Sequence, residues 1–513
     1  MAFSVSFPIL SFLLIVPILG AILTYALPRT PKMARLIAVG FSLATLLLAT
    51  LVLLGVFFPQ WVSLRLNPDS TQPRYGAHEE RTWIPQLGAK YALGVDALSA
   101  PLVFLNALLT TLAMVYAWDE KHRVPEFYAL LLLMSTTVAG VFVSLDFFLF
   151  FLFWEVGLIP MYFLIAVWGG ERRRYAAVKF FLYTQAASLL VLAGILILWY
   201  HHSGSFDMLG ILQGAYQGNS PLDGPLQYTK DLTFLAFLVG FGAKLPTVPF
   251  HTWLPDAHVE APTAGSVLLA GILLKLGGYG IIRVGVEMLP GLSPWVIQLT
   301  AILGATSILY GAVVCLVQDD LKRMVAFSSI GHMGFVLLGV AAWMWSGSRL
   351  ALAGAAFQLF AHGLISPALF MLAGSLGHRL GTRNISDLGG INALMPRTGG
   401  FMMVAFMASL GLPGLVGFVA ELTVFIGVWE AFGLWVIIPL ISVVITAGYY
   451  LYAMQRALFG PLREGVQTHG DLETFEVGPL AVLTVFFAVF GILPFILLDE
   501  ILAFVGKIPG SVP

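Results

Sequence analysis

The sequence predicts an all-α integral membrane protein that crosses the bilayer about fourteen times as a single polytopic domain. Of its 513 residues, 59% are hydrophobic types and only 10% are charged. A soluble domain carries roughly 25% charged residues because its surface must face water, whereas lipid tails remove that requirement. The chain also contains about fourteen apolar stretches close to the twenty residues that a spanning helix needs.

These stretches follow one another along the whole chain. The first, from about Ile9 to Leu27, lacks a basic leading segment, so it predicts a spanning helix and not a cleaved signal. Two longer polar connections, 59–93 and 201–230, are rich in Gly, Pro, Asn and Asp and predict loops. The predicted spans are 8–27, 35–58, 95–117, 127–145, 147–168, 176–200, 232–254, 263–289, 295–317, 323–345, 351–377, 399–428, 434–459 and 477–503.

Basic residues are unequally divided between the two sets of loops, which predicts the orientation. Sixteen follow odd-numbered spans and eight follow even-numbered spans or lie near the C-terminus. Since basic loops stay in the cytoplasm, the odd-numbered loops should be cytoplasmic and both termini should lie outside. The sixteen are Arg29, Lys32, Arg35, Lys121, Arg123, Arg172, Arg173, Arg174, Lys179, Lys322, Arg323, Arg379, Arg383, Arg397, Arg456 and Arg463; the eight are Arg65, Arg74, Arg81, Lys90, Lys230, Arg283, Arg349 and Lys507.

The seventh and twelfth spans each contain a helix-breaking motif. The seventh has Gly-Ala-Lys-Leu-Pro at 242–246, and the twelfth has Gly-Leu-Pro-Gly at 411–414. Proline removes an amide donor and clashes with the preceding turn, so both helices should break midway. Paired breaks at corresponding positions are typical of a transporter's ion site. The alternative is a simple proline kink at each position.

Glu155 and Lys244 are ionisable residues deep within apolar stretches. Burying a carboxylate such as Glu155 at this depth costs about 3 kcal/mol or more. Lys244 lies beside the break at Pro246, where water and loosened carbonyls come within reach. A buried lysine can exchange its proton near neutral pH, and a carboxylate favours its charged form, so the two residues are predicted to form a switchable pair. The alternatives are a neutral, hydrogen-bonded Glu155 and a Lys244 side chain that reaches the membrane surface.

Lys275, in the eighth span, is surrounded by small residues. Gly271, Gly277 and Gly278 allow another helix to approach closely, or leave room for water. This environment suits a proton carrier at the centre of the protein. The alternative is a structural lysine bonded to a backbone carbonyl.

His332, His362 and Glu421 extend the series through the tenth, eleventh and twelfth spans. An imidazole accepts and donates protons on its two nitrogens and titrates near neutrality, which suits a relay between a central lysine and a distant carboxylate. Glu421 follows the second break and would end the relay. The alternatives are hydrogen-bonded core histidines and a glutamate that caps the broken helix.

The sequence gives little support for disulfides, metal sites, or nucleic-acid or nucleotide binding. One cysteine, Cys315, excludes a disulfide framework and a cysteine-ligated cluster within the chain. A net charge of -1 implies no attraction to nucleic acid, and neither a dinucleotide fingerprint nor a phosphate-binding Gly-Lys-Ser/Thr motif is present. The segment with His251, Asp256, His258 and Glu260 could ligate zinc, but without a supporting Cys or second His pair a capping role is favoured.

The stretch from Leu149 to His332 resembles the antiporter-like membrane subunits of respiratory complex I, in particular the M-type chain of the proton-pumping NADH:quinone oxidoreductase. The run from Lys244 to Lys275 is the most specific part, and weaker similarity covers essentially the whole chain. The matching runs are Phe-Leu-Phe-Trp-Glu (151–155), Leu-Ile-Pro-Met-Tyr-Phe-Leu-Ile-Ala (158–166), Trp-Leu-Pro-Asp-Ala-His (253–258), Ala-Pro-Thr-Ala-Gly-Ser-Val (261–267), Leu-Ala-Gly-Ile-Leu-Leu-Lys (269–275) and Gly-His-Met-Gly-Phe-Val-Leu (331–337).

The resemblance implies two inverted five-helix repeats, with helices seven and twelve discontinuous. On this basis helices 1–3 occupy 1–126, the first repeat 127–289, the second repeat 295–459, and the last helix 477–513. It also implies partners: sister antiporter-like subunits on either side in the lipid bilayer, and no nucleic acid. Flavin, iron–sulfur clusters and quinone would belong to partner subunits, with no cofactor or redox centre in this chain. The location would be an energy-transducing membrane, with the bacterial plasma membrane as the first expectation.

The resemblance further implies that the ionisable residues translocate protons: Glu155, Lys244, Lys275, His332, His362 and Glu421. Sister subunits usually carry lysine where this chain has Glu421, which is why the M-type chain is indicated. Quinone reduction elsewhere in the complex would supply the energy. Two alternatives stay open from related assemblies, a subunit of a multisubunit sodium/proton antiporter and a subunit of a ferredoxin-driven complex. A structural spacer is disfavoured, because a spacer would not bear the cost of six buried ionisable groups.

Overall fold

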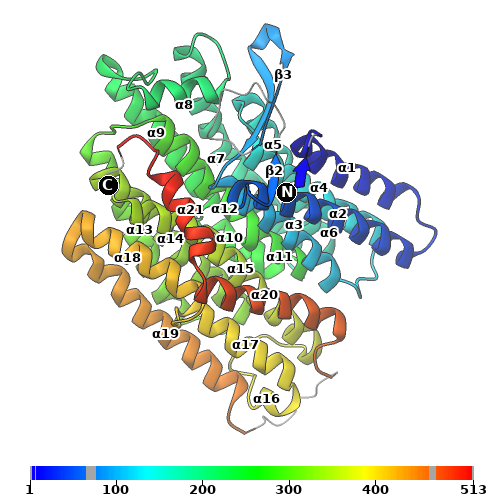
Figure 1. The fold of residues 1–513 in the computed structure, drawn as a ribbon. Coiled ribbons are helices and arrows are strands. Elements are labelled where there is room, and N and C mark those ends of the chain that lie inside the picture. Colours follow the sequence, from blue (N-terminus) through cyan, green and yellow to red (C-terminus); the bar gives the residue numbers. More distant parts are fainter. Residues whose placement is uncertain (1–2, 6, 65–76, 462–469, 511–513) are drawn as a thin grey trace.

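The computed structural model describes residues 3–5, 7–64, 77–461 and 470–510, which form a bundle of long helices. Within these ranges, twelve helices are long and apolar enough to cross a membrane. The helices lie side by side, with the N-terminal α1 and α2 at one edge and α18 and α19 at the opposite edge (Figure 1). The protein is therefore a multi-pass membrane protein, as its composition predicts. Arg65, Arg74 and Arg463, which entered the orientation argument, lie outside the described residues.

The first six predicted spans correspond to helices in the structure. The interior helices α3 and α4 are buried over most of their surface, whereas α1, α2 and α7 expose apolar side chains suited to lipid. Gly157 separates α5 from α6 within one span. These helices are α1 (Ile9–Ala26), α2 (Pro31–Phe57), α3 (Ser99–Tyr116), α4 (Val124–Val143), α5 (Phe147–Val156), α6 (Leu158–Trp168) and α7 (Arg173–His201).

The seventh span is broken at the predicted proline motif. Helix α9 (Gln227–Lys244) ends at the lysine itself, and eight residues separate it from α10 (Trp253–Glu260). The Trp253 indole donates to the carbonyl of Ala243 at 2.9 Å, and the Ser307 hydroxyl accepts from the amide of Val248 at 3.0 Å. Backbone groups freed by the break thus find partners within the protein, as a spanning segment requires.

The eighth span carries Lys275 on a short α-helical segment between two π-helical segments. Its parts are α11 (Thr263–Leu268), the π-helical η3 (Leu269–Leu273), α12 (Leu274–Gly280) and the π-helical η4 (Ile281–Val286). Small residues allow this span to pack closely: a Cβ added at Gly277 would lie 2.4 Å from the carbonyl oxygen of Phe241, at the end of α9. The close approach predicted from the glycines around Lys275 is therefore present.

The remaining spans form the C-terminal half. The twelfth is broken between Ser409 and Val416, where Gly411 and Gly414 adopt positive φ angles of 81° and 90° that favour glycine. The last predicted span, 477–503, is also divided, at Leu493–Pro494. The helices are α13 (Pro294–Cys315), α14 (Leu321–Ser346), α15 (Arg349–Leu380), α16 (Ile391–Leu394), α17 (Pro396–Ser409), α18 (Val416–Phe432), the 3₁₀ turn η5 (Gly433–Val436), α19 (Ile437–Leu458), α20 (Thr474–Ile492) and α21 (Phe495–Val505).

The two long connections are not loops throughout, so that prediction was wrong in part. The first contains an antiparallel hairpin whose strand β3 is charged and exposed, which hides its strand character in the sequence. Glu79 of β3 accepts hydrogen bonds from the first turn of α1, including the amide of Leu10 at 2.8 Å. The short elements are β1 (Phe3–Val5), parallel to β2 (Val62–Leu64); β3 (Ala77–Ile84), η1 (Pro85–Leu87) and β4 (Ala89–Val95); and α8 (Met208–Tyr216) and η2 (Gly224–Leu226).

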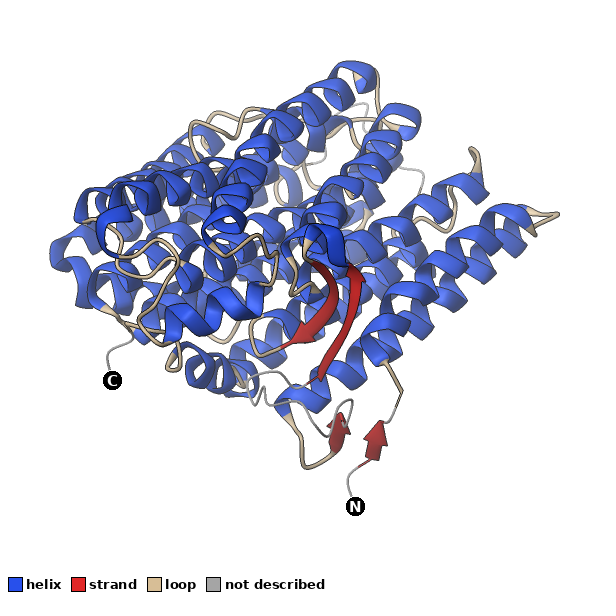
Figure 2. Cartoon of the chain, turned by 90° about the horizontal axis from the view of Figure 1, so that it is seen from above, coloured by secondary structure: helices blue, strands red, loops and turns tan. Residues whose placement is uncertain are grey.

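The strands form two separate two-stranded sheets: β1 and β2 lie beside the N-terminus, and the β3–β4 hairpin lies nearer the middle of the view (Figure 2). They account for few residues, so the all-α class is correct. Discontinuous helices at the seventh and twelfth positions are also observed. The total of fourteen spans and the pair of inverted repeats, with the boundaries given above, stay predictions.

Candidate proton-relay site

Lys275 lies at the centre of a connected set of buried polar side chains. It is fully buried, and its Nζ lies 2.7 Å from His362 Nδ1 on α15. The same Nζ donates to the carbonyl of Ala270 in the π-helical segment before it. Gly363 brings α15 this close, since a Cβ there would lie 3.3 Å from Lys275 Cε. The structure thus combines the predicted lysine–histidine contact with the backbone contact foreseen as the alternative.

His362 and His332 follow, on the neighbouring helices α15 and α14. Their ring centroids are 5.4 Å apart. Both rings line a small cavity that leaves about 10 Å³ for the centre of a water molecule. This is about the space that one water molecule needs. The hydroxyl of Ser366, at 3.4 Å from His362 Nδ1, faces the same ring. One bridging water would complete a hydrogen-bonded path between the two imidazoles.

Glu421, in the second turn of α18, ends the set. Its Oε1 lies 3.3 Å from His332 Nδ1. Gly411 of the helix break provides the space, because a Cβ there would lie 2.9 Å from Glu421 Oε2. Lys275, His362, His332 and Glu421 therefore form one buried series of titratable groups across four helices. The four residues are those that the sequence predicts, but the two histidines stand in the reverse order, with His362 beside Lys275 and His332 beside Glu421.

A side branch joins this chain at His332. The Ser409 hydroxyl lies 3.2 Å from His332 Nε2 and donates to the Tyr450 hydroxyl at 2.7 Å. Tyr450 in turn donates to Ser328 at 3.1 Å. Sequence reasoning missed these hydroxyl groups, because Ser and Tyr are common in membrane helices and show no distinguishing spacing.

Glu155 and Lys244, predicted to form a switchable pair, lie near each other without a direct ion pair in this structure. No N–O distance of 4.0 Å or less joins them. Lys244 Nζ instead donates to the carbonyl of Trp154 at 3.2 Å and lies 3.5 Å from the centre of the Trp154 ring. One oxygen of Glu155 is buried without a hydrogen-bond partner, although the residue as a whole is half-buried at the side of the bundle. The Lys244 side chain is buried, so it does not reach the surface.

Two further buried bases, Lys322 and His258, belong to the buried titratable groups around Lys275. Lys322 donates from Nζ to the carbonyl of Ala261 at 2.6 Å, one turn after His258. Both imidazole nitrogens of His258 are buried without a hydrogen-bond partner, and both lysines, 322 and 275, act on it electrostatically. Sequence reasoning placed Lys322 among the loop charges and His258 in a capping segment, so it assigned a relay role to neither.

Four basic residues assigned to loops are buried in the structure, which corrects that part of the sequence analysis: Lys230, Arg283, Lys322 and Arg379. Two belong to each side, so the imbalance of basic residues persists. The clearest case is Arg283 in the eighth span, whose guanidinium binds both oxygens of Asp96 at 2.6 and 2.7 Å and also contacts Glu287. This cluster ties the end of the eighth span to the residues just before α3.

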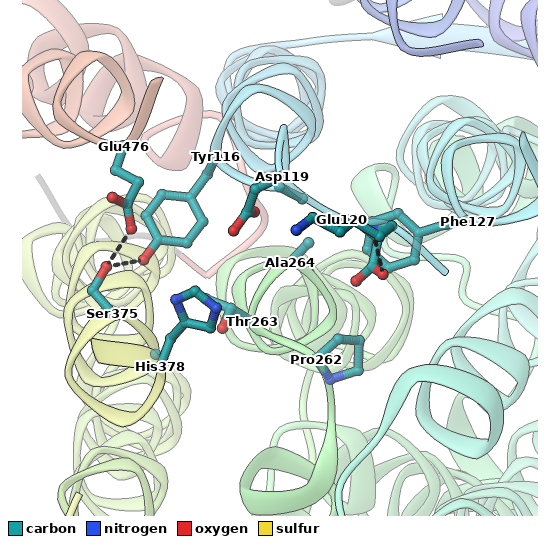
Figure 3. Close-up of a pocket in the computed structure, with 13 residues that line it drawn as sticks. Tyr116, Asp119, Glu120, Phe127, Pro262, Thr263, Ala264, Ser375, His378 and Glu476 are labelled. Carbon is teal, nitrogen blue, oxygen red and sulfur yellow. Dashed lines mark hydrogen bonds between the residues drawn. The ribbon is translucent and has the colours of Figure 1, made fainter. Parts of the chain in front are cut away.

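A polar cavity of about 430 Å³ opens where the α3–α4 connection, α11, α15 and α20 meet (Figure 3). The labelled side chains of Asp119, Glu120 and His378 surround it, together with Glu476 (Figure 3). Ser375 donates to Glu476 at 2.8 Å and contacts the Tyr116 hydroxyl, which closes one wall. Thr263, the first residue of the eighth span, lines the cavity, so the cavity leads toward the helix that carries Lys275.

The segment considered for zinc turns its side chains to different partners. His251 packs against Tyr310, and His258 stacks on Phe370 with 4.3 Å between ring centroids. Asp256 accepts from Lys179 at 2.6 Å, and Glu260 accepts from the amide of Arg172 at 2.9 Å. Within the described ranges, no three His, Cys, Asp or Glu side chains gather in a manner that would hold a metal ion.

Comparison with known proteins agrees with the fold. The family described as NADH:quinone oxidoreductase/Mrp antiporter, transmembrane, matches residues 144–446. The chain is 43% identical over 500 residues to F(420)H(2) dehydrogenase subunit M of Methanosarcina mazei, covering 96% of both. It is 40% identical to an NAD(P)H-quinone oxidoreductase chain 4 of Synechococcus sp. (strain JA-3-3Ab), covering 93% of this chain and 88% of the relative.

Solved structures of membrane complexes contain chains with the same fold. A chain of respiratory complex I from Thermus thermophilus superposes with a TM-score of 0.83 at 28% identity, covering 97% of this chain and 99% of that one. A chain of the Mrp complex from Dietzia sp. DQ12-45-1b superposes with a TM-score of 0.80 at 23% identity, covering 98% of this chain and 52% of that chain. The second likeness is one of fold alone.

Proposed function

This chain belongs to the NADH:quinone oxidoreductase/Mrp antiporter family of membrane proteins, and we propose that it is a proton-translocating membrane-arm subunit of an NADH:quinone oxidoreductase. The observation that carries the proposal is the buried chain from Lys275 through His362 and His332 to Glu421, with its contacts of 2.7 and 3.3 Å at the two ends. Four buried titratable groups in series are costly in a membrane, and proton transfer is the function that such a series serves.

In this proposal a proton enters from the cytoplasmic side through the polar cavity beside Thr263. It passes Lys322 and His258 to reach Lys275, whose Nζ hands it to His362. A lysine that has lost its proton can accept the next, while the imidazole passes the first to His332 through the water-sized gap. Glu421 receives the proton and releases it on the outer side, on which both chain termini would lie.

Glu155 and Lys244 supply the drive in this proposal. Two lysines in a low-dielectric interior repel each other when both are charged, so a charge at Lys244 favours proton loss from Lys275. Movement of Lys244 Nζ from Trp154 toward Glu155 would weaken that repulsion and allow Lys275 to take up a proton again. Because Glu155 is half-buried at the side of the bundle, a charged residue of a neighbouring subunit could bias the exchange.

The neighbours would be sister antiporter-like subunits on either side, one against the face of α5 and α7 and one against the face of α18 and α19. Both faces expose large apolar side chains, such as Leu182 and Val444 at 61% and 72% exposure. Flavin, iron–sulfur clusters and quinone would belong to other subunits, as would the electron donor, and the assembly would lie in an energy-transducing membrane such as the bacterial plasma membrane. The named relatives differ in their printed donors, F(420)H(2) and NAD(P)H.

Affinity purification of the assembled complex tests this assignment. Co-purifying subunits that contain flavin and iron–sulfur clusters, and quinone reduction coupled to proton movement in vesicles, are the expected results. Sodium/proton exchange by a particle without redox centres would favour the antiporter alternative. Reduction of quinone by ferredoxin, and not by NADH, would favour a ferredoxin-driven complex.

A further inference from the structure

An apolar groove of about 440 Å³ lies outside the relay, between α1, α4 and α6. The three helices pack together at the N-terminal edge of the bundle (Figure 1). Small buried side chains, Ala21 and Ala129, form the floor, while Ile22 and Phe163 rise beside it with 55% and 45% of their surface exposed. The groove thus faces the lipid and is deeper than the surface around it.

The length of the groove matches one leaflet of the bilayer. Along α4 it extends from Arg123 to Leu133, and ten residues of α-helix rise about 15 Å. The hydrocarbon core is about 30 Å thick, so the groove reaches from one membrane surface to the middle. Tyr25 and Trp168 stand at its mouth, where aromatic side chains mark the level of the headgroups.

The segments that border the mouth of the groove carry an excess of basic residues. The connections that border it, 27–35, 117–126 and 169–174, contain eight Lys and Arg against four Asp and Glu. The Arg123 side chain is 53% exposed although its Nε contacts Glu126 at 3.2 Å. The Arg173 guanidinium donates to the carbonyls of Val167 and Gly169 at 3.3 and 3.4 Å, which holds it beside the groove wall. A guanidinium has five N–H donors, so both arginines can bind a phosphate in addition to these contacts.

We propose that this groove binds one anionic phospholipid from the leaflet on the side of the basic connections. An acyl chain fills the space over Ala21 and Ala129, and the phosphate lies between Arg123 and Arg173. Basic pockets between membrane helices recognise such headgroups, and arginine pairs with phosphate in a directional, bidentate manner. A helix of a neighbouring subunit is the competing occupant, but it would not need the concentration of positive charge at the mouth.

The test uses the purified complex in nanodiscs that contain a phosphatidylglycerol probe with a photoreactive group at the end of one acyl chain. A phosphatidylcholine probe is used in parallel. Labelled peptides from α1, α4 and α6 are compared with those from α19. Val444 of α19 is 72% exposed, and lipid is expected to contact this helix without specific binding. The phosphatidylglycerol probe should label the peptides of the groove more strongly than those of α19. The phosphatidylcholine probe should label the groove peptides less than the phosphatidylglycerol probe does. Equal labelling by both probes, or labelling no higher than on α19, overturns the proposal.

Substitutions distinguish the part of the groove that would bind the acyl chain from the part that would bind the headgroup. Ala129→Trp fills the floor and should reduce labelling to the α19 level; Ile22→Trp, at the exposed wall, provides the same test if Ala129→Trp fails to assemble. Arg123→Gln and Arg173→Gln should each weaken phosphatidylglycerol labelling about fivefold, the effect of one basic residue near an anionic surface. The matched control is Arg323→Gln, an exposed arginine on α14, which should change nothing. Unchanged labelling in the groove variants, or a disulfide between Ile22→Cys and a cysteine in a neighbouring subunit, rules out a bound lipid.

Discussion

The two groups of buried ionisable residues differ in how well this chain connects their members. On one side, Lys275, His362, His332 and Glu421 follow one another across four helices, and a serine–tyrosine branch supports His332, although Nε2 of His362 has no hydrogen-bond partner. On the other side, Lys244 rests on Trp154, and an oxygen of Glu155 is buried without a hydrogen-bond partner. The subunit therefore contains a path that one bridging water would complete, and beside it, at the side of the bundle, a pair of residues that are not in direct contact.

This contrast suggests a division of labour. A buried polar atom without a partner costs about 1–3 kcal/mol, so a group left in that condition in the isolated chain is expected to find a partner in an assembly or to move. The relay needs only a proton supply and an outlet. The pair near the side of the bundle needs a signal from outside the chain, and it is the place where coupling to a neighbour can act. The predictions below test that division.

Replacement of Lys275 should have the largest effect. Lys275→Met keeps the length of the side chain but removes the charge and the contact with His362, so proton uptake in vesicles should fall by about a hundredfold, within the range for loss of a positioned proton carrier. Assembly on native gels should be normal. Lys32→Met, the same exchange at an exposed position, is the control. Full pumping by an assembled Lys275→Met complex would disprove the central role.

Glu421 should show the next largest effect and should distinguish charge transfer from hydrogen bonding. Glu421→Gln fits the same space beside His332 but cannot titrate, so proton uptake should fall about tenfold or more. Glu421→Ala should lose most of its activity as well, whereas Glu421→Lys should keep appreciable activity because lysine also carries one exchangeable proton. Glu430→Gln, on the exposed part of the same helix, is the control. If Gln matches wild type, Glu421 is a structural group and the outlet lies elsewhere.

The sequence predicted the fold well where physical constraints are simple. Apolar length identifies spans, and Pro246 and Pro413 identify two broken helices because proline cannot continue the hydrogen-bond ladder. Pro494 divides α20 from α21 by the same mechanism, a break that the single predicted span 477–503 does not contain. The β3–β4 hairpin escaped prediction because Glu79, Glu80 and Arg81 interrupt the alternation that marks a strand.

The site was predictable to a different degree. A lone charge in an apolar span is costly, and this rule identified the two lysines and two glutamates of the proposed relay. The two histidines were identified because an imidazole titrates near neutrality. Contacts are a matter of packing, so the rule could not show that Lys244 prefers Trp154 to Glu155. Nor could it find Ser409, whose neutral side chain carries no such cost. Lys322 escaped for the opposite reason: it precedes Arg323 at the start of a helix, where a basic residue normally faces water.

A double-mutant cycle tests whether Glu155 and Lys244 are energetically coupled. Glu155→Gln and Lys244→Met should each reduce coupled pumping about fivefold, and the double variant should be little worse than either, since contacting or networked residues couple by 0.5–3 kcal/mol. Trp154→Leu should change the size of this coupling, because Trp154 holds Lys244 in the observed position. Strictly additive effects on pumping and assembly would show that the two groups act independently.

Tyr450→Phe should have the smallest effect. It tests whether the side branch at His332 belongs to the proton path. The Tyr450 hydroxyl connects Ser409 to Ser328, so its removal leaves buried polar groups short of one partner and should cost about 1 kcal/mol of stability. If protons leave through Glu421, pumping should fall by no more than about twofold, because His332 keeps its carboxylate contact. Tyr449→Phe, one residue away on the same helix, controls for loss of a buried hydroxyl. Proton uptake and thermal stability should be measured on the same preparation. A loss of pumping as severe as that of Glu421→Gln, without a matching loss in Tyr449→Phe, would mean that the proton leaves through the Ser409–Tyr450–Ser328 branch, and the assignment of the outlet to Glu421 would be wrong.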